Sequence, residues 1–128
     1  MPKHPKVSII IPSLGRGEVL AKCLESIKAQ TFADYEVILE TEEGPLAKIR
    51  NQATKKAQGQ YLVFIDDDTV QTKTWLESIV RAFENGAFGV SGPSIIPDSH
   101  RKQRDLFRWK KVKSLYDSFF CEGKEDLP

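Results

Sequence analysis

The sequence predicts an α/β fold: a mainly parallel, four-stranded sheet flanked by helices. Apolar, β-branched runs recur along the chain without polar alternation, as strands buried on both faces require. Stretches with helical apolar periodicity separate these runs. The 128 residues suffice for one compact domain, and no apolar run approaches the ~20 residues that a membrane-spanning helix needs.

The elements are expected in strict alternation of strand and helix. The run KVSIIIPS stops at a proline. Apolar side chains then fall on one face of each of the next two predicted helices, and these faces are expected to be buried: Val19, Leu20, Cys23, Leu24 and Ile27 in the first, and Leu46, Ile49, Ala53 and Ala57 in the second. The third helix ends at Asn-Gly, and the second is expected to end at Gly59, because glycine favours helix ends. The predicted strands are residues 6–13, 35–40, 61–65 and 88–92, and the predicted helices are 17–30, 44–59 and 73–86.

A polar break near residues 97–104 divides a predicted domain, residues 1–97, from a tail, residues 98–128. Apolar residues recur in the tail at three- and four-residue steps, which predicts a basic amphipathic helix within residues 101–120. Residues 101–128 carry 8 Lys/Arg against 5 Asp/Glu, whereas residues 1–100 carry 11 against 13. Attraction to anionic partners is therefore expected of the tail.

Three aspartates, Asp66, Asp67 and Asp68, directly follow the third predicted strand. Open parallel sheets bind ligands beyond the carboxyl ends of their strands, so these side chains lie at the expected binding edge. A turn with helix capping would explain one aspartate, but three in succession repel one another and favour a cation. Mg²⁺ and Mn²⁺ are often held by one or two carboxylates together with substrate phosphates. The sequence therefore predicts a Mg²⁺ or Mn²⁺ site that also binds a diphosphate.

The succession of motifs around these aspartates resembles the family-2 glycosyltransferases, whose nucleotide-sugar-binding domain has the Rossmann-like GT-A fold. The resemblance covers roughly residues 6 to 97, and its order along the chain makes it more specific than an isolated DxD motif. It implies a UDP- or GDP-sugar as donor and inverting transfer of the sugar to an acceptor. The matching motifs are IIIPSLGR (9–16), LAKCLESIKAQT (20–31), IRN (49–51), AQGQYLVFIDDDT (57–69) and GVSGPSIIP (89–97).

The resemblance implies separate roles for the three aspartates. Asp66 would contact the ribose or uridine part of the donor. Asp68 would bind the metal that bridges the diphosphate, and Asp67 would contribute to either contact. The cation would neutralise the leaving nucleoside diphosphate as the bond to the sugar breaks.

Four further residues are candidates for donor binding through the same resemblance. Pro12 and Ser13 match the platform for the base, or else they simply end the strand in a turn. Arg50 matches an arginine of the nucleotide site, and its alternative is a surface ion pair with the glutamates before it. Where the family commonly has DDGS, this chain has ETEEG (40–44), so Glu42 is the candidate for the acid that contacts the base.

No residue can be assigned as the catalytic base, because no motif frames the acids that follow Gly92. We therefore expect the donor half of a glycosyltransferase, with a completing domain or partner chain supplying the acceptor side. The first alternative is a nucleotide-sugar-binding module or truncated remnant that does not turn over. The second is a haloacid-dehalogenase-like phosphatase, because residues 66–70 fit its DxDx[TV] motif and Ser91 fits its second motif. That nucleophile, however, normally ends the first strand of its domain.

The tail at residues 101–120 has several interpretations. It would cover the active site or reach the acceptor, rest on anionic lipid, or pack its apolar face on the domain. Nucleic-acid binding is not expected, because no supporting fold accompanies the charge. The N-terminal apolar run is too short for a signal peptide, so we expect a cytoplasmic protein, with the tail available for contact at the cytoplasmic membrane surface.

Overall fold

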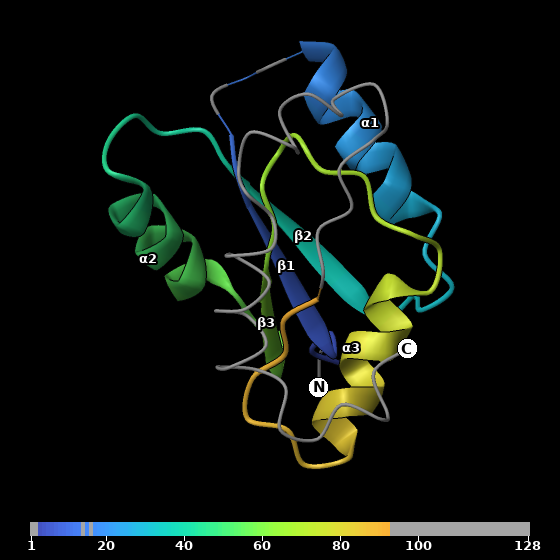
Figure 1. Cartoon of the computed structure of the whole chain (residues 1–128). Coiled ribbons are helices and arrows are strands. Elements are labelled where there is room, and N and C mark those ends of the chain that lie inside the picture. The colour runs from blue at the N-terminus through green and yellow to red at the C-terminus, as the bar shows by residue number, and fades with distance from the viewer. Residues whose placement is uncertain (1–2, 14, 16, 93–128) are drawn as a thin grey trace, which may run out of the picture. The chain divides into compact units, whose positions relative to one another are not determined.

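A computed structural model describes residues 3–13, 15 and 17–92 of the chain. The chain divides between Phe88 and Gly89 into two units, and all the helices and strands given below belong to the first. The described elements, in chain order, are β1 (Val7–Pro12), α1 (Gly17–Lys28), β2 (Tyr35–Glu40), α2 (Leu46–Lys56), β3 (Tyr61–Phe64) and α3 (Trp75–Glu84) (Figure 1).

The described strands form a parallel sheet in the order β2-β1-β3, so the first strand of the chain is the central one. All six residues of β1 are buried, which explains its continuous apolar sequence. β1 pairs with β2 from Val7 opposite Tyr35 to Pro12 opposite Glu40, and it pairs with β3 as far as Ile10. The predicted parallel arrangement is therefore confirmed for these three strands.

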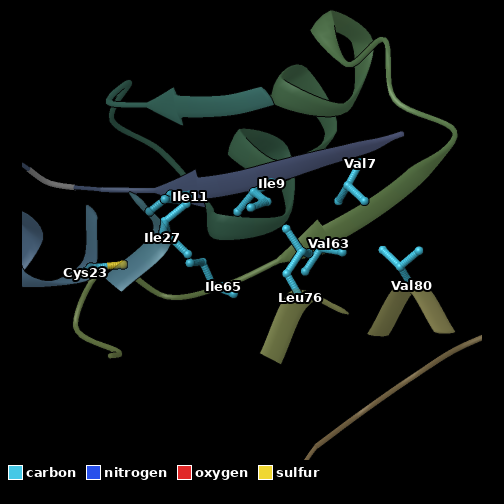
Figure 2. Close-up of a cluster of buried hydrophobic side chains, with 9 residues drawn as sticks. All are labelled: Val7, Ile9, Ile11, Cys23, Ile27, Val63, Ile65, Leu76 and Val80. Carbon is cyan, nitrogen blue, oxygen red and sulfur yellow. The ribbon is translucent and has the colours of Figure 1, made fainter. Parts of the chain in front are cut away.

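One face of the sheet packs against α1 and α3 through a single apolar cluster (Figure 2). Alternate residues of β1 point into this cluster, because successive side chains of a strand face opposite sides. α1 contributes Cys23 and Ile27, and α3 contributes Leu76 and Val80. The strand residues of the cluster are Val7, Ile9, Ile11 and Val63, and Ile65 follows β3.

The opposite face of the sheet is covered in part by α2, which lies across from α1 and α3 (Figure 1). Ile10 is fully buried on this face. Lys56 of α2 reaches the Glu40 carboxylate at 2.7 Å, which fixes the helix to the end of β2. On β3 the same face carries Leu62 and Phe64, which are 36% and 44% exposed. The prediction of a sheet flanked by helices is thus confirmed within the described residues, where helices lie on both of its faces.

The prediction of a fourth strand at residues 88–92 is wrong for the described chain, which forms no strand there. Phe88 is fully exposed, and the segment contains Gly89 and Gly92. Glycine disfavours strands, and a single β-branched residue, Val90, offers little side-chain packing to offset that. The helix predicted within residues 101–120 lies outside the described residues.

Two details of the predicted helices also differ. Val19 and Leu46 were expected on buried helix faces, but they are 42% and 47% exposed. α2 ends at Lys56, and Ala57 already has an extended backbone with ψ 134°, so Gly59 does not end the helix. Gly59 instead lies against β1: a Cβ atom there would come within 2.5 Å of the Ser8 nitrogen. Gly59 is thus required for its close approach to β1 and not for ending α2, as the sequence had suggested.

Candidate functional site

Segments that follow the three strands meet at the carboxyl edge of the sheet and enclose a cleft of about 290 Å³. The segment after β1 contributes one wall, the connection from β2 into α2 another, and the acidic segment after β3 a third. This convergence is the usual position of a ligand site in a parallel sheet. The lining residues are Pro12, Ser13, Gly44, Leu46, Ile49, Asp66, Asp67 and Asp68.

The three aspartates alternate in exposure along the chain. Asp66 and Asp68 are exposed, whereas Asp67 between them is only 2% exposed. The side chain of Asp67 accepts a hydrogen bond of 2.8 Å from the Ser13 hydroxyl. All three line the cleft, but Asp66 and Asp68 are open to solvent there, whereas the carboxylate of Asp67 is turned toward Ser13 and is almost fully covered.

Ser13 connects the end of β1 to its neighbours through three hydrogen bonds. Its backbone N–H donates to the Glu40 carbonyl at 2.8 Å. Its hydroxyl donates to Asp67 and accepts a hydrogen bond of 3.1 Å from the Gly15 N–H. Gly15 has φ 78°, in the left-handed region that glycine adopts without strain. Glycine at this position allows the chain to turn back onto Ser13.

The segment that carries the aspartates is held from below by α1 and by its own turn. The Asp66 carbonyl accepts a hydrogen bond of 2.8 Å from the Thr69 hydroxyl and a weaker contact of 3.7 Å from the Cys23 thiol. Cys23 is fully buried, and this burial raises the pKa of its thiol, so the group stays protonated and can donate. The acidic segment is thus anchored to the apolar core.

The chain that follows the acidic segment is also held in place, by hydrogen bonds with a side chain of α1 and with one just after this helix. Gln30 donates to the Thr72 carbonyl at 2.7 Å and accepts from the Leu76 N–H at 3.0 Å. Ser26 accepts from the Gln71 N–H at 3.1 Å. Neither Ser26 of α1 nor Gln30, which follows the end of α1, was identified from the sequence. A polar residue near an apolar helix face does not indicate a hydrogen-bond partner that is distant in the sequence.

Arg50 lies beside the cleft, where its Nη2 contacts the Asp66 carboxylate at 3.4 Å. In the described part of the chain its ion-pair partner is this aspartate and not the glutamates that precede α2. Its Nε is buried and makes no hydrogen bond to any residue that the structure describes. A buried donor without an acceptor is unfavourable by about 1–3 kcal/mol, so an additional oxygen ligand at this position would be stabilising.

The first turn of α2 presents apolar side chains to the cleft, and the connection before it contributes Gly44 rather than an acidic side chain. Glu42 is exposed and is not among the lining residues, whereas Leu46 and Ile49 are. Glu40, the acid at the end of β2, is buried and accepts a hydrogen bond from Lys56, which raises the pKa of that lysine. Leu46 and Ile49 were expected only as core positions of α2, since helical periodicity does not show which end of an apolar stripe reaches a cleft.

In the described ranges, no group of three or more His, Cys, Asp or Glu side chains is placed to hold a metal ion. The two exposed aspartates supply hard oxygen donors, the kind that Mg²⁺ and Mn²⁺ prefer. Their chemistry thus fits a cation that takes its other ligands from a bound molecule or from water.

The model of glycosyl transferase family 2 matches residues 39–125, which is more than half of the chain. The chain belongs to glycosyltransferase family 2. The match includes Arg50 and the three aspartates, and it continues through the tail to residue 125. Membership of this family favours the glycosyltransferase interpretation of the DxDx[TV] motif over the phosphatase alternative.

Several curated glycosyltransferases align with this family member over most of its length. An uncharacterized glycosyltransferase of Bacillus subtilis, YwdF, is 29% identical in an alignment of 115 positions that covers 71% of this chain and 43% of that protein. A GalNAc(5)-diNAcBac-PP-undecaprenol β-1,3-glucosyltransferase of Campylobacter jejuni is 24% identical, covering 72% of this chain and 39% of the relative. A glucosyl-dolichyl phosphate glucuronosyltransferase of Haloferax volcanii is 22% identical, in an alignment that covers 80% of this chain and 42% of the relative.

The chain spans less than half the length of each of these relatives. Within the residues that the structure describes, no helix is both long enough and apolar enough to cross a membrane.

Proposed function

We propose that the cleft binds the diphosphate of a nucleoside-diphosphate sugar together with a divalent cation. The observation that carries this proposal is the alternation of the aspartates. Two carboxylates are presented at one cleft surface, and the residue between them is turned inward. Two neighbouring carboxylates repel each other, and a divalent cation bound between them would offset that repulsion.

Asp66 and Asp68 are the residues that would hold Mg²⁺ or Mn²⁺. Small divalent cations are commonly bound by one or two carboxylates, with the remaining ligands supplied by substrate phosphates and water. The cation, when bound, would neutralise charge on the nucleoside diphosphate as it departs from the sugar.

Arg50 is proposed to bind the diphosphate. Its guanidinium is partly exposed beside the cleft and lies next to Asp66, with Nη2 at 3.4 Å from that carboxylate. A guanidinium binds phosphate through paired, charge-assisted hydrogen bonds. The ion pair with Asp66 would hold Arg50 near the cleft before the ligand arrives.

Pro12, Leu46 and Ile49 supply the apolar side chains of the cleft lining. We propose that these side chains contact the nucleoside, because bases and ribose have apolar faces. Leu46 is 47% exposed, so a ligand that covered it would remove apolar surface from water. The base, uracil or guanine, is left to the binding experiment described below, and the role expected for Glu42 stays a prediction.

For the whole protein we propose transfer of the sugar to an acceptor with inversion at the anomeric carbon. Two of the relatives bear names with undecaprenol- or dolichyl-linked compounds. A lipid-linked acceptor is therefore the class to test first, with the basic tail at residues 101–120 contacting anionic lipid on the cytoplasmic side of the membrane. The catalytic base is not assigned, and a completing domain or partner chain would supply it.

The donor site can be tested by calorimetric titration of the chain with UDP, GDP and their sugar conjugates, in Mn²⁺ and in EDTA. Asp68→Ala is the test variant. Asp34→Ala is the matched control, because Asp34 is an exposed acid just before β2, at the opposite edge of the sheet.

We expect one of the nucleotides to bind in Mn²⁺, to bind at least tenfold more weakly in EDTA, and to be lost in Asp68→Ala while Asp34→Ala binds normally. Equal binding with and without Mn²⁺, or equal losses in both variants, would contradict the proposed cation site. Absence of binding in a chain shown to be folded would contradict the proposed function of the cleft.

A further inference from the structure

We infer that Ser13 and Asp67 are positioning residues, which hold Asp66 and Asp68 at the cleft surface without binding the ligand themselves. This inference rests on the proposed function of the cleft. It differs from the expectation that Ser13 contacts the base and that Asp67 contacts the donor or the metal. Two features of the geometry support it: the hydrogen bonds of Ser13 and the burial of Asp67.

The Ser13 hydroxyl has a single hydrogen, and that hydrogen is used in the 2.8 Å bond to Asp67. One of its two lone pairs accepts from the Gly15 N–H. Ser13 itself is 5% exposed. A hydroxyl with its donor engaged and so little exposed surface cannot donate to a base or a sugar unless the bond to Asp67 breaks.

Asp67 is similarly turned away from a ligand, since it is 2% exposed. A buried carboxylate is unfavourable unless polar groups bind it, and the Ser13 hydroxyl is one such group. The three aspartates lie in and beside a turn in which the Asp66 carbonyl accepts from the N–H and the hydroxyl of Thr69. Holding Asp67 inward restrains this turn, which presents Asp66 and Asp68 at the cleft surface. The hydrogen bond between Ser13 and Asp67 therefore sets the direction of the two exposed carboxylates.

The same strand offers a close internal control. Ser8, at the other end of β1, also donates its hydroxyl to a carboxylate, that of Glu36, and accepts from a glycine N–H, that of Gly59 at 2.8 Å. Ser8 is fully buried and lies away from the cleft. Ser8→Ala and Ser13→Ala therefore remove comparable interactions, but only the second affects the acidic segment.

The experiment compares the Mn²⁺-dependent nucleotide affinity and the urea stability of the full chain in four forms: wild type, Ser8→Ala, Ser13→Ala and Ser13→Thr. Changes to residues that orient metal ligands typically weaken metal affinity by about 10–100-fold. We expect Ser13→Ala to lose about tenfold in affinity. Ser13→Thr, which keeps the hydroxyl, should recover most of this loss, and Ser8→Ala should lower stability with less than a threefold change in affinity.

Two results would overturn the inference. Affinity within threefold of wild type in Ser13→Ala would mean that the bond to Asp67 does not position the carboxylates. Equal losses in Ser8→Ala and Ser13→Ala would mean that both act only through stability. If Ser13→Ala does not fold, Ser13→Cys, which fills the same space with a weak donor, replaces it with the same expected loss. If the wild-type chain itself binds no nucleotide, the proposed function of the cleft is contradicted. Failure of that proposal can therefore be distinguished from failure of this inference, which concerns only the variants.

Discussion

Gly59 lies so close to β1 that any side chain there should weaken the fold. A Cβ atom at this position would come within 2.5 Å of the Ser8 nitrogen, 2.6 Å of the Ser8 Oγ and 2.6 Å of the Val7 carbonyl carbon. Two of these three atoms are backbone of the central strand, which cannot move aside as a flexible side chain would. Gly59→Ala must therefore displace the entry to β3 from β1.

The expected loss has two parts. Overpacking of a well-packed region costs about 1–3 kcal/mol. Displacement also lengthens the 2.8 Å hydrogen bond from the Gly59 N–H to Ser8, which is worth about 1 kcal/mol. The free energy of unfolding should thus fall by about 2–4 kcal/mol, a large fraction of the 5–15 kcal/mol typical of small domains.

Urea unfolding followed by circular dichroism measures this change. For a domain of this size the slope is about 1–3 kcal/mol per M, so the midpoint should fall by roughly 1–3 M. Gly17→Ala is the matched control, because a Cβ atom at this first residue of α1 meets nothing within 4 Å. An unchanged midpoint in Gly59→Ala, or an equal drop in Gly17→Ala, would refute the steric argument.

Three further predictions follow from single contacts. Hydrogen bonds from the Ser8 hydroxyl and, to a smaller extent, from backbone N–H groups lower the pKa of Glu36 below its ordinary 4.5. The stability that the charged Glu36 contributes is therefore present above pH 4.5 and is lost as pH falls through the lowered pKa. The difference in urea midpoint between wild type and Glu36→Gln should therefore be larger at pH 7 than at pH 3, and a constant difference would contradict this. Burial and a raised pKa should protect Cys23 from alkylation by iodoacetamide at pH 8 in the native chain, whereas the chain in urea should be labelled. Mass spectrometry measures the labelling, and fast labelling of the native chain would show that the thiol is accessible. Arg50→Lys should weaken pyrophosphate binding in Mn²⁺ about tenfold, because a lysine lacks the planar fork, and calorimetry showing unchanged affinity would rule out a direct contact.

The sequence was sufficient to predict most of the fold because the strands and helices have different periods. β1 is buried on both faces and reads as an unbroken apolar run, and the stripe of α3 repeats at helical steps. The false strand at residues 88–92 shows the limit of this signal. A short run such as FGVSG is compatible with a strand in its composition, but a strand also requires a partner, and composition does not supply one.

The site was predictable in position but not in its internal arrangement. Asp66, Asp67 and Asp68 follow a buried strand, and the rule for open parallel sheets places them at the cleft. The sequence alone does not distinguish the buried aspartate from its exposed neighbours, since that difference arises from a hydrogen bond to Ser13, 54 residues earlier in the chain. The contact of Arg50 with Asp66 likewise depends on how α2 packs on the sheet.

The most direct test of the central claim is to locate Mn²⁺ in the chain by paramagnetic broadening of its amide NMR signals, in the presence of whichever nucleotide binds more tightly. If Asp66 and Asp68 hold the cation with the diphosphate, the signals of residues 66–68 and of Ser13 and Leu46 should broaden first and should broaden more strongly when the nucleotide is present. Broadening centred on other acids, or broadening at the cleft that is indifferent to nucleotide, would contradict a shared cation and diphosphate site.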